Sequence, residues 1–591
     1  MAKYFARQGY RTVYLSLTDT SIDINKVHKR EVDNCLECFF KRTNEGIYIL
    51  KEFQRKFERS HVEFGFEDLL QRLENECTPA DVAFIVACPD WVDYLTKITN
   101  DSKLIYDCLD NWETFITDLD LGYNEITIHH ERKLASLADL IIVSSKSLYV
   151  KMAPFNDHLY YLPNGVWNAD YSKLCHIDTV PNDIKNIKKP IVFFMGAIAG
   201  WVDIELIRFL AESRPEYSFV FVGTKMQEEL PECPNIYYLG KKKYEELPLY
   251  LKQAKVAIIP FKVNKLTAAV TPLKFYEYLS SATPVVTTVM PDLIGLQGSK
   301  MAQNYEEFLK YLDAYISMDE EQYQLEALRA VQTSKSFDWS ILLEPLCSFI
   351  DGKDFEVLPK NDFMTEMIKT YQTLQGQDYI KNELITLYNS TGQYQMSCSL
   401  FGKDENIEEK DGIDLHQLSL AYFKQGDIEY SIRLLKMYLN GKDKLLQVYV
   451  ESISNDENRV IFLELFLLKI CGFIYDALRK ADELYLMWRT NPKFLGMVCS
   501  LYMDVGEYDL AFQYGMEAID VGEKYGYEEI LDFYSLSFLI SELCKLKKYD
   551  AAESIALSLT DVNEDWEEQI VKILADLYFI REFDLSKTVS D

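Results

Sequence analysis

The stretch PIVFFMGAIAGWVDIELIRFLAESRPEYSFVFVG, residues 190–223, decides the fold class, because it alternates strand and helix patterns. Its two ends, PIVFFMG (190–196) and SFVFVG (218–223), are short apolar runs of the kind that form buried strands, and a helical pattern lies between them. Strands that alternate with helices are typical of parallel α/β layers. The same alternation extends from the start of the chain to about residue 350.

Ten runs in this region are strand candidates, and they fall into two sets that are separated near the polar segment DTVPNDIKNIKKP (178–190). This division predicts two Rossmann-like domains in tandem with a cleft between them. The candidates are RTVYLS (11–16), DVAFIVA (81–87), KLIYDCL (103–109), LIIVSS (140–145), YYLPN (160–164), PIVFFMG (190–196), SFVFVG (218–223), IYYLG (236–240), VAIIPF (256–261) and PVVTT (284–288).

Beyond about residue 360 the strand signal nearly vanishes and helical patterns dominate, which predicts an all-α region. Short segments that pair a turn with an aromatic or aliphatic residue recur there at intervals near 34 residues, and a non-repetitive helical bundle is the alternative interpretation. The segments resemble degenerate tetratricopeptide repeats, whose stacked helix pairs expose a concave face. They are TGQYQMS (391–397), QGDIEYS (425–431), FIYDALRKA (473–481), VGEYDLA (505–511) and LKKYDAA (546–552).

Composition narrows the classes of partner. The 591 residues carry a net charge of −31, so the overall field repels phosphate backbones and argues against a nucleic-acid partner. No run reaches the ~18 apolar residues of a membrane span, and no apolar signal core is present, so we expect a cytoplasmic protein with at most peripheral membrane contact. Of twelve cysteines only Cys35 and Cys38 form a CxxC pair, which is more typical of two ordinary thiols than of a zinc site.

The first 350 residues contain several ordered segments that resemble retaining glycosyltransferases of the GT-B fold, in particular the large family 4 group. The segments are IYDCLDNWETF (105–115), ERKLASLADLIIVSSKSL (131–148), LPNGVW (162–167), FFMGAIAGWVDIELIRFLAESRPEYSFVFVG (193–223), NIYYLGKKKYEELPLYLKQAKVAIIPF (235–261) and TPLKFYEYLSSATPVV (271–286). GT-B chains normally open with a strand and a glycine loop, whereas MAKYFARQGYRTVYLS begins within an apparent helix.

The resemblance implies a GT-B fold followed by an all-α, tetratricopeptide-like region. The acceptor-side domain would comprise residues 1–177 together with a crossing helix at 336–350, and the donor domain residues 178–335. The helical repeats would comprise residues 363–591 and would hold the acceptor or a protein partner.

A nucleotide-sugar site needs a ribose acceptor and donors for diphosphate oxygens. Glu277 fits the first role because a carboxylate can accept hydrogen bonds from both ribose hydroxyls, and the resemblance aligns it with a motif glutamate. The helix start at Thr271, Pro272 and Leu273 would hold the diphosphate, with Lys274 adding charge. The alternative is that this segment is helix core and Lys274 a solvated charge.

The sequence also departs from the family pattern. The partner of the motif glutamate is Ala269 here, and the loop after Gly196 lacks the usual Arg and Lys, so Lys274, Lys225 or Lys265 must meet the diphosphate charge. Ala282 stands where glycine usually ends the helix, at a cost of roughly 1 kcal/mol if the backbone is left-handed there.

On the acceptor side, Asp107 and Asp110 follow a strand that is predicted to end at the cleft. We expect Asp110, and next Asp107, to position or bind the acceptor, while helix capping before NWETF is an equally weighted alternative. Ser145 is a cleft residue by resemblance.

The resulting expectation is a metal-independent retaining glycosyltransferase. It would move a sugar from a UDP- or GDP-sugar to a cell-surface glycan, a lipid-linked carrier or a protein. A catalytically silent GT-B-like subunit that scaffolds a partner transferase is the alternative, and an epimerase acting on the nucleotide-sugar is a weaker one.

Overall fold

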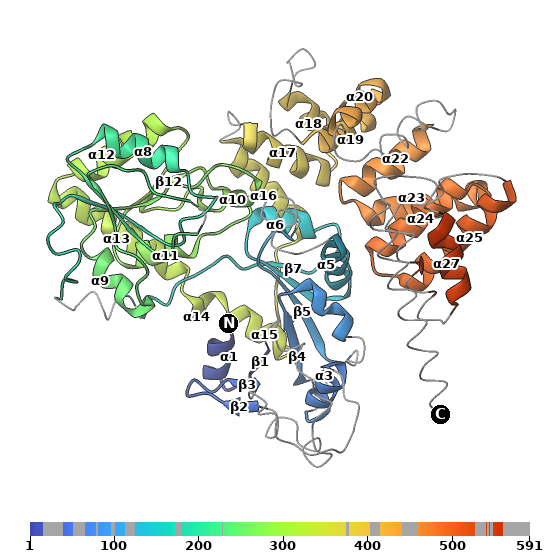
Figure 1. The fold of residues 1–591 in the computed structure, drawn as a ribbon, viewed down its shortest axis with the longest axis horizontal. Coiled ribbons are helices and arrows are strands. Elements are labelled where there is room, and N and C mark those ends of the chain that lie inside the picture. Colours follow the sequence, from blue (N-terminus) through green and yellow to red (C-terminus); the bar gives the residue numbers. More distant parts are fainter. Residues whose placement is uncertain are drawn as a thin grey trace. The chain divides into compact units, whose positions relative to one another are not determined.

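The computed structural model describes residues 1–15, 40–50, 66–77, 81–95, 101–112, 125–169, 171, 179–226, 228–373, 378–401, 414–439, 459–525, 539–540, 543 and 548–558. These residues fall into two compact units, Met1–Thr127 with Leu137–Ile380, and Ile128–Ser136 with Lys381–Asp591. The first unit is α/β and the second is built from helices (Figure 1), so the expected order of α/β and then all-α is confirmed. Cys35 and Cys38 lie outside the described residues.

The acceptor-side domain has a four-stranded parallel sheet in the order β4-β5-β6-β7. Its strands are β4 Ala83–Val86, β5 Lys103–Cys108, β6 Leu140–Val143 and β7 Leu159–Tyr161. The run at 11–16 contributes instead to a small separate sheet, which consists of β1 Val13–Tyr14, β2 Phe40–Arg42 and β3 Tyr48–Leu50. The helices are α1 Ala2–Arg7, α3 Phe66–Asn75, η5 Pro89–Leu95, α5 Glu125–Leu137 and α6 Lys146–Met152.

The donor domain has a six-stranded parallel sheet in the order β10-β9-β8-β11-β12-β13. Counted from its first strand this order is 3-2-1-4-5-6, the order of Rossmann-type sheets. The strands are β8 Ile191–Met195, β9 Ser218–Val222, β10 Ile236–Tyr238, β11 Val256–Ile259, β12 Val285–Thr288 and β13 Ser299–Ala302. The helices are α8 Ile204–Ser213, η6 Tyr244–Glu246, α9 Leu247–Leu251, α10 Lys265–Ala268, α11 Leu273–Ser280, η7 Pro291–Leu293, α12 Tyr305–Ser317 and α13 Glu320–Ser336.

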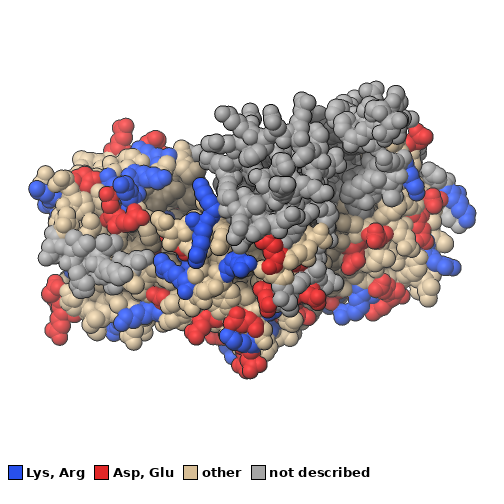
Figure 2. All heavy atoms as spheres, turned by 90° about the horizontal axis from the view of Figure 1, so that it is seen from below, with Lys and Arg blue, Asp and Glu red and all other residues tan. Residues whose placement is uncertain are grey.

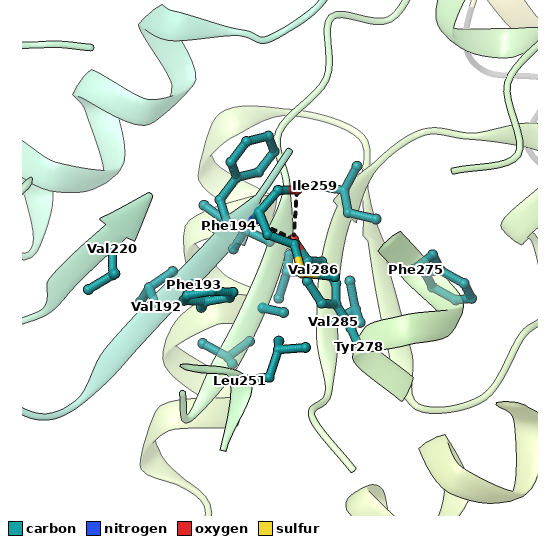
Figure 3. Packing of buried hydrophobic residues seen from close by; sticks show 14 of the residues in the cluster. Val192, Phe193, Phe194, Val220, Leu251, Ile259, Phe275, Tyr278, Val285 and Val286 are labelled. Atoms are coloured by element: carbon teal, nitrogen blue, oxygen red, sulfur yellow. Dashed lines mark hydrogen bonds between the residues drawn. The ribbon is translucent and has the colours of Figure 1, made fainter. Parts of the chain in front are cut away.

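The core of the donor domain explains why its strands are almost uniformly apolar. All five residues of β8 and all five of β9 are buried, as expected for a parallel sheet that helices cover on both faces. Figure 3 shows Phe193, Phe194 and Val286 packed around Tyr278 of α11. The Tyr278 hydroxyl accepts a hydrogen bond from the backbone N–H of Met195 at 2.8 Å, which fixes α11 to the end of β8.

Three short helices follow the donor domain, namely α14 Trp339–Leu342, α15 Glu344–Ile350 and α16 Lys360–Gln372. Leu343 and Leu346 belong to the same buried cluster as Ile105 of β5 and Leu140 of β6. The chain therefore returns from the donor domain to pack on the acceptor-side sheet, which completes two Rossmann-like domains of the GT-B kind.

The second unit consists largely of helix pairs that are joined by three-residue turns. Each turn has a glycine with positive φ, at Gly392, Gly426, Gly472 and Gly506. The next helices begin at Tyr394, Ile428, Ile474 and Tyr508, where the recurring segments place their turn-to-helix change. The helices are α17 Asp378–Ser390, α18 Tyr394–Leu400, α19 Leu415–Lys424, α20 Ile428–Leu439, α22 Arg459–Ile470, α23 Ile474–Trp488, α24 Pro492–Asp504, α25 Tyr508–Tyr525 and α27 Tyr549–Ser558.

Buried polar contacts join successive turns of this unit. The Asn389 side-chain amide donates to the Gln417 carbonyl at 2.8 Å, and the Gln417 amide donates to the Cys471 carbonyl at 3.2 Å. The buried Asp504 carboxylate pairs with Arg132 at 2.6 Å, so residues Ile128–Ser136 belong to this unit. The assignment to tetratricopeptide-like repeats stays a prediction.

Charges of both signs share the molecular surface. On the face drawn in Figure 2, lysine and arginine side chains alternate with aspartate and glutamate across the coloured part of the chain. An interspersed surface of this kind offers no extended basic track for a nucleic acid, in agreement with the net charge of −31.

The end of α11 allows a stability prediction. Ala282 has φ +59°, and the N–H groups of Ala282 and Thr283 donate to the carbonyls of Leu279 and Tyr278, which is the Schellman pattern that favours glycine. We expect Ala282→Gly to raise the free energy of unfolding by about 0.5–1 kcal/mol, because relief of the left-handed strain exceeds the added entropy of the unfolded chain. Chemical denaturation measures this change.

A matched control for this substitution lies within α12. Ala314→Gly places glycine in a regular helix and should lower the free energy of unfolding by about 1 kcal/mol. A destabilising effect of Ala282→Gly equal to that of Ala314→Gly would contradict the assignment of strain to Ala282.

Candidate functional site

The candidate site lies where the donor sheet changes direction. β8 pairs with β9 on one side and with β11 on the other, so the chain leaves these neighbouring strands in opposite directions. Ligands of open parallel sheets bind at the carboxyl ends of the strands at such a switch point. Gly196 follows β8 and Phe261 follows β11 closely, which places both at this position.

Two glycines keep the ends of β8 and β9 free of side chains. Gly196 has φ +137° and Gly223 has φ +149°, conformations that other residues rarely adopt. A Cβ atom on Gly223 would lie 1.8 Å from the carbonyl oxygen of Gly196, so only glycine fits there. The backbone next to the switch point is therefore open to a neighbouring group.

Lys274 supplies that group. Its Nζ lies 4.5 Å from the ring centroid of Phe194 and 4.7 Å from that of Phe261, and a Cβ atom on Gly196 would lie 2.5 Å from it. The ammonium makes no ion pair or hydrogen bond with any residue that the structure describes. Burial lowers the pKa of Lys274 to about 8, against the opposing field of Glu277. A positive charge without a counter-charge thus stands between two aromatic rings at the switch point.

Glu277 lies one helical turn after Lys274, so both side chains belong to one side of α11. Only 5% of Glu277 is exposed, and its Oε1 has no hydrogen-bond partner among the described residues. Burial raises the pKa of Glu277, whereas the hydroxyls of Tyr171 and Tyr244 and the charge of Lys274 lower it. The carboxylate therefore retains an unused acceptor, which a bound hydroxyl could satisfy.

The N-terminus of α11 is tied to the acceptor-side domain. The Thr271 hydroxyl donates to the Ser144 carbonyl at 2.6 Å, and the Asn164 side-chain amide donates to the Thr271 carbonyl at 2.6 Å. Pro272 is the N-cap and carries no N–H, so the backbone donors left for an anion are those that begin the helix, at Leu273 and Lys274. Thr271 and Pro272 shape this helix start rather than offer free side-chain donors.

Two other predicted binding residues are engaged elsewhere. The Ser145 hydroxyl is buried and accepts a hydrogen bond from the Leu148 N–H at 3.2 Å, which caps α6. Lys225 pairs with Glu229, and its Nζ lies 4.8 Å from the Tyr238 ring centroid. No contact among the described residues joins either one to Lys274 or Glu277, and their binding roles stay predictions.

The two predicted acceptor residues lie at the end of β5. Asp107 is 4% exposed, and burial raises its pKa to about 7, with the Met1 amine opposing the rise and Asp110 adding to it. Burial also raises the pKa of the more exposed Asp110. Asp107 thus shares a proton near neutral pH, while Asp110 is the better placed of the two to meet a ligand. Both acceptor roles stay predictions.

Several residues of the site have no signal in the sequence pattern. Phe194 and Phe261 appear as ordinary ends of apolar strands, and their meeting at Lys274 follows only from the sheet order. Tyr171 and Tyr244 come from the connection between β7 and β8 and from η6, and each influences the pKa of Glu277. The glycines after β8 and β9 were the available clue to the location.

Metal and membrane features were also sought. Within the described ranges, no group of three or more His, Cys, Asp or Glu side chains is arranged to hold a metal ion. No helix in that same part of the chain is both long enough and apolar enough to cross a bilayer.

Comparisons with known proteins concern the α/β half of the chain. A curated relative, "Putative teichuronic acid biosynthesis glycosyltransferase TuaH" of Bacillus subtilis (strain 168), is 24% identical over 345 residues, which cover 52% of this chain and 84% of the relative. Among solved structures, sucrose-phosphate synthase from Thermosynechococcus elongatus is 13% identical with a TM-score of 0.41, covering 53% of this chain and 85% of that one. Anabaena HepE in complex with UDP and glucose is 14% identical with a TM-score of 0.38, covering 48% and 81%.

The family comparison falls on the donor domain. Residues 189–317 include every strand of the six-stranded sheet, together with Gly196, Lys274 and Glu277. A glycosyltransferase function is thereby supported, since these residues match the family model described as "Glycosyl transferases group 1".

Proposed function

We propose that the α/β region is a metal-independent retaining glycosyltransferase that takes its sugar from a nucleotide-sugar, a UDP- or GDP-sugar. The observation that carries this proposal is the pairing on α11 of an uncompensated ammonium, Lys274, with a buried carboxylate that has an unused acceptor, Glu277. A nucleoside diphosphate presents an anion and a vicinal diol at a comparable separation. The two protein groups match these two features in charge and hydrogen-bonding capacity.

The chemistry of transfer assigns roles to these groups. The glycosidic bond forms between the anomeric carbon and an acceptor hydroxyl oxygen, while the bond from that carbon to the diphosphate oxygen breaks. Lys274 and the first N–H groups of α11 would stabilise the charge that develops on the leaving diphosphate. The proton of the acceptor would pass to a phosphate oxygen on the same face, which needs no protein nucleophile and is consistent with retention. Asp110 would orient the acceptor at the end of β5.

The acceptor class is proposed from the curated relative. The name of the Bacillus subtilis protein refers to teichuronic acid biosynthesis. We therefore favour a cell-surface glycan or its lipid-linked precursor over a protein acceptor. The helical unit would hold this acceptor or a partner protein on a repeat surface.

A nucleotide-sugar panel tests the proposal. We expect at least one of the common UDP- and GDP-sugars to raise the melting temperature of the full chain, because a ligand that binds only the folded state stabilises it by RT ln(1 + [L]/Kd). The same donor should then be hydrolysed slowly or transferred, with the nucleoside diphosphate as product. Failure of every UDP-, GDP- and dTDP-sugar to bind would refute the proposal.

A second candidate function has one specific observation in its favour. Ala269, at the position of the family's first motif glutamate, is 2% exposed and offers no polar group to the transferred sugar. A catalytically silent subunit that scaffolds a partner transferase would retain this feature. It predicts donor binding or none, but no turnover with any acceptor unless a second enzyme is present.

A further inference from the structure

Two buried polar groups face each other in the donor domain without completing a hydrogen bond. The Tyr171 hydroxyl and Glu277 Oε1 are both inaccessible to solvent, and neither has a hydrogen-bond partner of ordinary geometry among the described residues. They are nonetheless close, because the Glu277 charge raises the pKa of Tyr171 and the Tyr171 hydroxyl lowers that of Glu277. Buried groups left in this way are unfavourable, and in native proteins they usually mark the position of a missing partner.

The chemistry of the pair defines that partner. A phenol can donate one hydrogen bond, and a carboxylate only accepts, so a group placed between them must accept from the first and donate to the second. An alcohol hydroxyl does both with its single oxygen atom. A phosphate oxygen would be repelled by the carboxylate, and an ammonium could not accept from the phenol. The pair therefore fits a sugar hydroxyl, and a water molecule would replace it in the free protein.

Tyr171 is well fixed for such a role. It is 1% exposed and belongs to the buried cluster that includes Phe275 and Tyr278 of α11. Its ring lies 6.2 Å from that of Tyr244 in an edge-to-face arrangement with an interplanar angle of 85°. A rigid phenol loses little conformational entropy when it binds a ligand, which favours discrimination between ligands.

Tyr244 provides the route of entry. It lies on the short helix η6, its side chain is 46% exposed, and its hydroxyl also lowers the pKa of Glu277. An exposed side chain on a single helical turn can rotate at small cost, whereas Tyr171 cannot. A ligand hydroxyl would thus displace Tyr244 from the carboxylate and leave Tyr171 in place.

We infer that Tyr171 is a ribose-recognition residue, whose hydroxyl donates to the same ribose oxygen that donates to Glu277, so that the site selects ribonucleotides over deoxyribonucleotides. The inference rests on the proposed function, because it assigns a further residue to the same nucleotide site. It goes beyond the carboxylate alone by making recognition depend on a donor from the connection between the two α/β domains.

The test compares ligands that differ by one hydroxyl. Calorimetry would measure the affinities of UDP and GDP and of their 2′-deoxy and 3′-deoxy forms for the wild-type chain and for Tyr171→Phe, which removes only the hydroxyl. We expect wild type to prefer the ribonucleotide, and Tyr171→Phe to lose about three- to tenfold of its preference over one of the two deoxy forms. The affinity for that deoxy form itself should hardly change.

Tyr315→Phe is the matched control. Tyr315 is another fully buried tyrosine of the donor domain whose hydroxyl has no hydrogen-bond partner in the described part of the chain, and it lies on α12 rather than at α11. This variant should keep the wild-type preference. Circular dichroism would check that both variants fold, and the wild-type comparison stands even if Tyr171→Phe does not.

The outcomes separate the inference from the proposed function. If wild type binds UDP or GDP but does not distinguish the deoxy forms, or if Tyr171→Phe retains the full preference, the inference is overturned while the nucleotide site stands. If wild type binds neither nucleotide, the proposed function fails and the inference fails with it. A selective loss in Tyr171→Phe supports both.

Discussion

Glu277→Ala is expected to lower the affinity for the nucleoside diphosphate of the donor by about 10²-fold, since two hydrogen bonds to a charged group are lost. The carboxylate is 5% exposed with an unused Oε1, so it can hold the two hydroxyls of a ribose without competing solvent. Calorimetry with UDP and GDP measures the affinity, and product release from a nucleotide-sugar measures kcat/KM. Both quantities should fall together, because the contact to ribose is equally strong in the ground state and in the transition state.

Two further variants make this result specific. Glu277→Gln retains the shape of the side chain but offers one acceptor and one donor, so it should recover only part of the affinity. Asp313→Asn removes a carboxylate that pairs with Arg214 on the helical layer of the same domain, and it should leave the affinity unchanged. Full donor affinity in Glu277→Ala would refute the assignment of Glu277 to the ribose.

The strand pattern of the α/β region could be predicted well, and its exceptions have clear causes. All ten predicted runs contain a strand, because parallel strands that are buried on both faces require continuous apolar sequence. β13 was missed because its sequence SKMA is polar at the start and lies at the edge of the sheet. The run at 11–16 was placed among the main strands, although it pairs with β3 in a separate small sheet.

The site could be predicted only along the chain. Lys274 and Glu277 are three residues apart in one helix, and Gly196 follows a clear strand, so local pattern was sufficient to find them. Phe194, Phe261 and Tyr171 come from distant segments, and their approach to α11 depends on strand order and on the path between the domains. The left-handed backbone at Ala282 is an intermediate case, since the helix end predicts it and the structure confirms it.

Lys274→Met should remove donor binding and at the same time stabilise the free protein. Loss of the ammonium deprives the diphosphate of its one nearby side-chain charge, and we expect the affinity for UDP and GDP to fall by about 10²-fold. The folded pKa of about 8 lies below the ordinary 10.5, so the charged lysine is disfavoured by folding at neutral pH. An apolar side chain of similar length between Phe194 and Phe261 should therefore raise the free energy of unfolding at pH 7 by about 1–3 kcal/mol.

The same pKa predicts how binding depends on pH. Above a pH of about 8 the free protein holds Lys274 neutral, so a diphosphate binds only with the uptake of a proton and the affinity falls as the pH rises. The contribution of Lys274 to stability changes in the opposite sense, because the unfolded chain binds more protons between about 8 and 10.5 and stability rises across that interval. Affinity and unfolding free energy, each measured from pH 6.5 to 9.5, should therefore diverge.

Lys274→Arg separates charge from titration. Arginine keeps a positive charge throughout this pH range and can stack on both aromatic rings, so it should retain part of the affinity and lose the change near pH 8. If Lys274→Met instead lowers the stability at pH 7, the lysine is a structural element of the core. If the wild-type affinity remains constant through pH 8 to 9, the ammonium does not contact the diphosphate, and the anion must depend on the backbone donors of α11 alone.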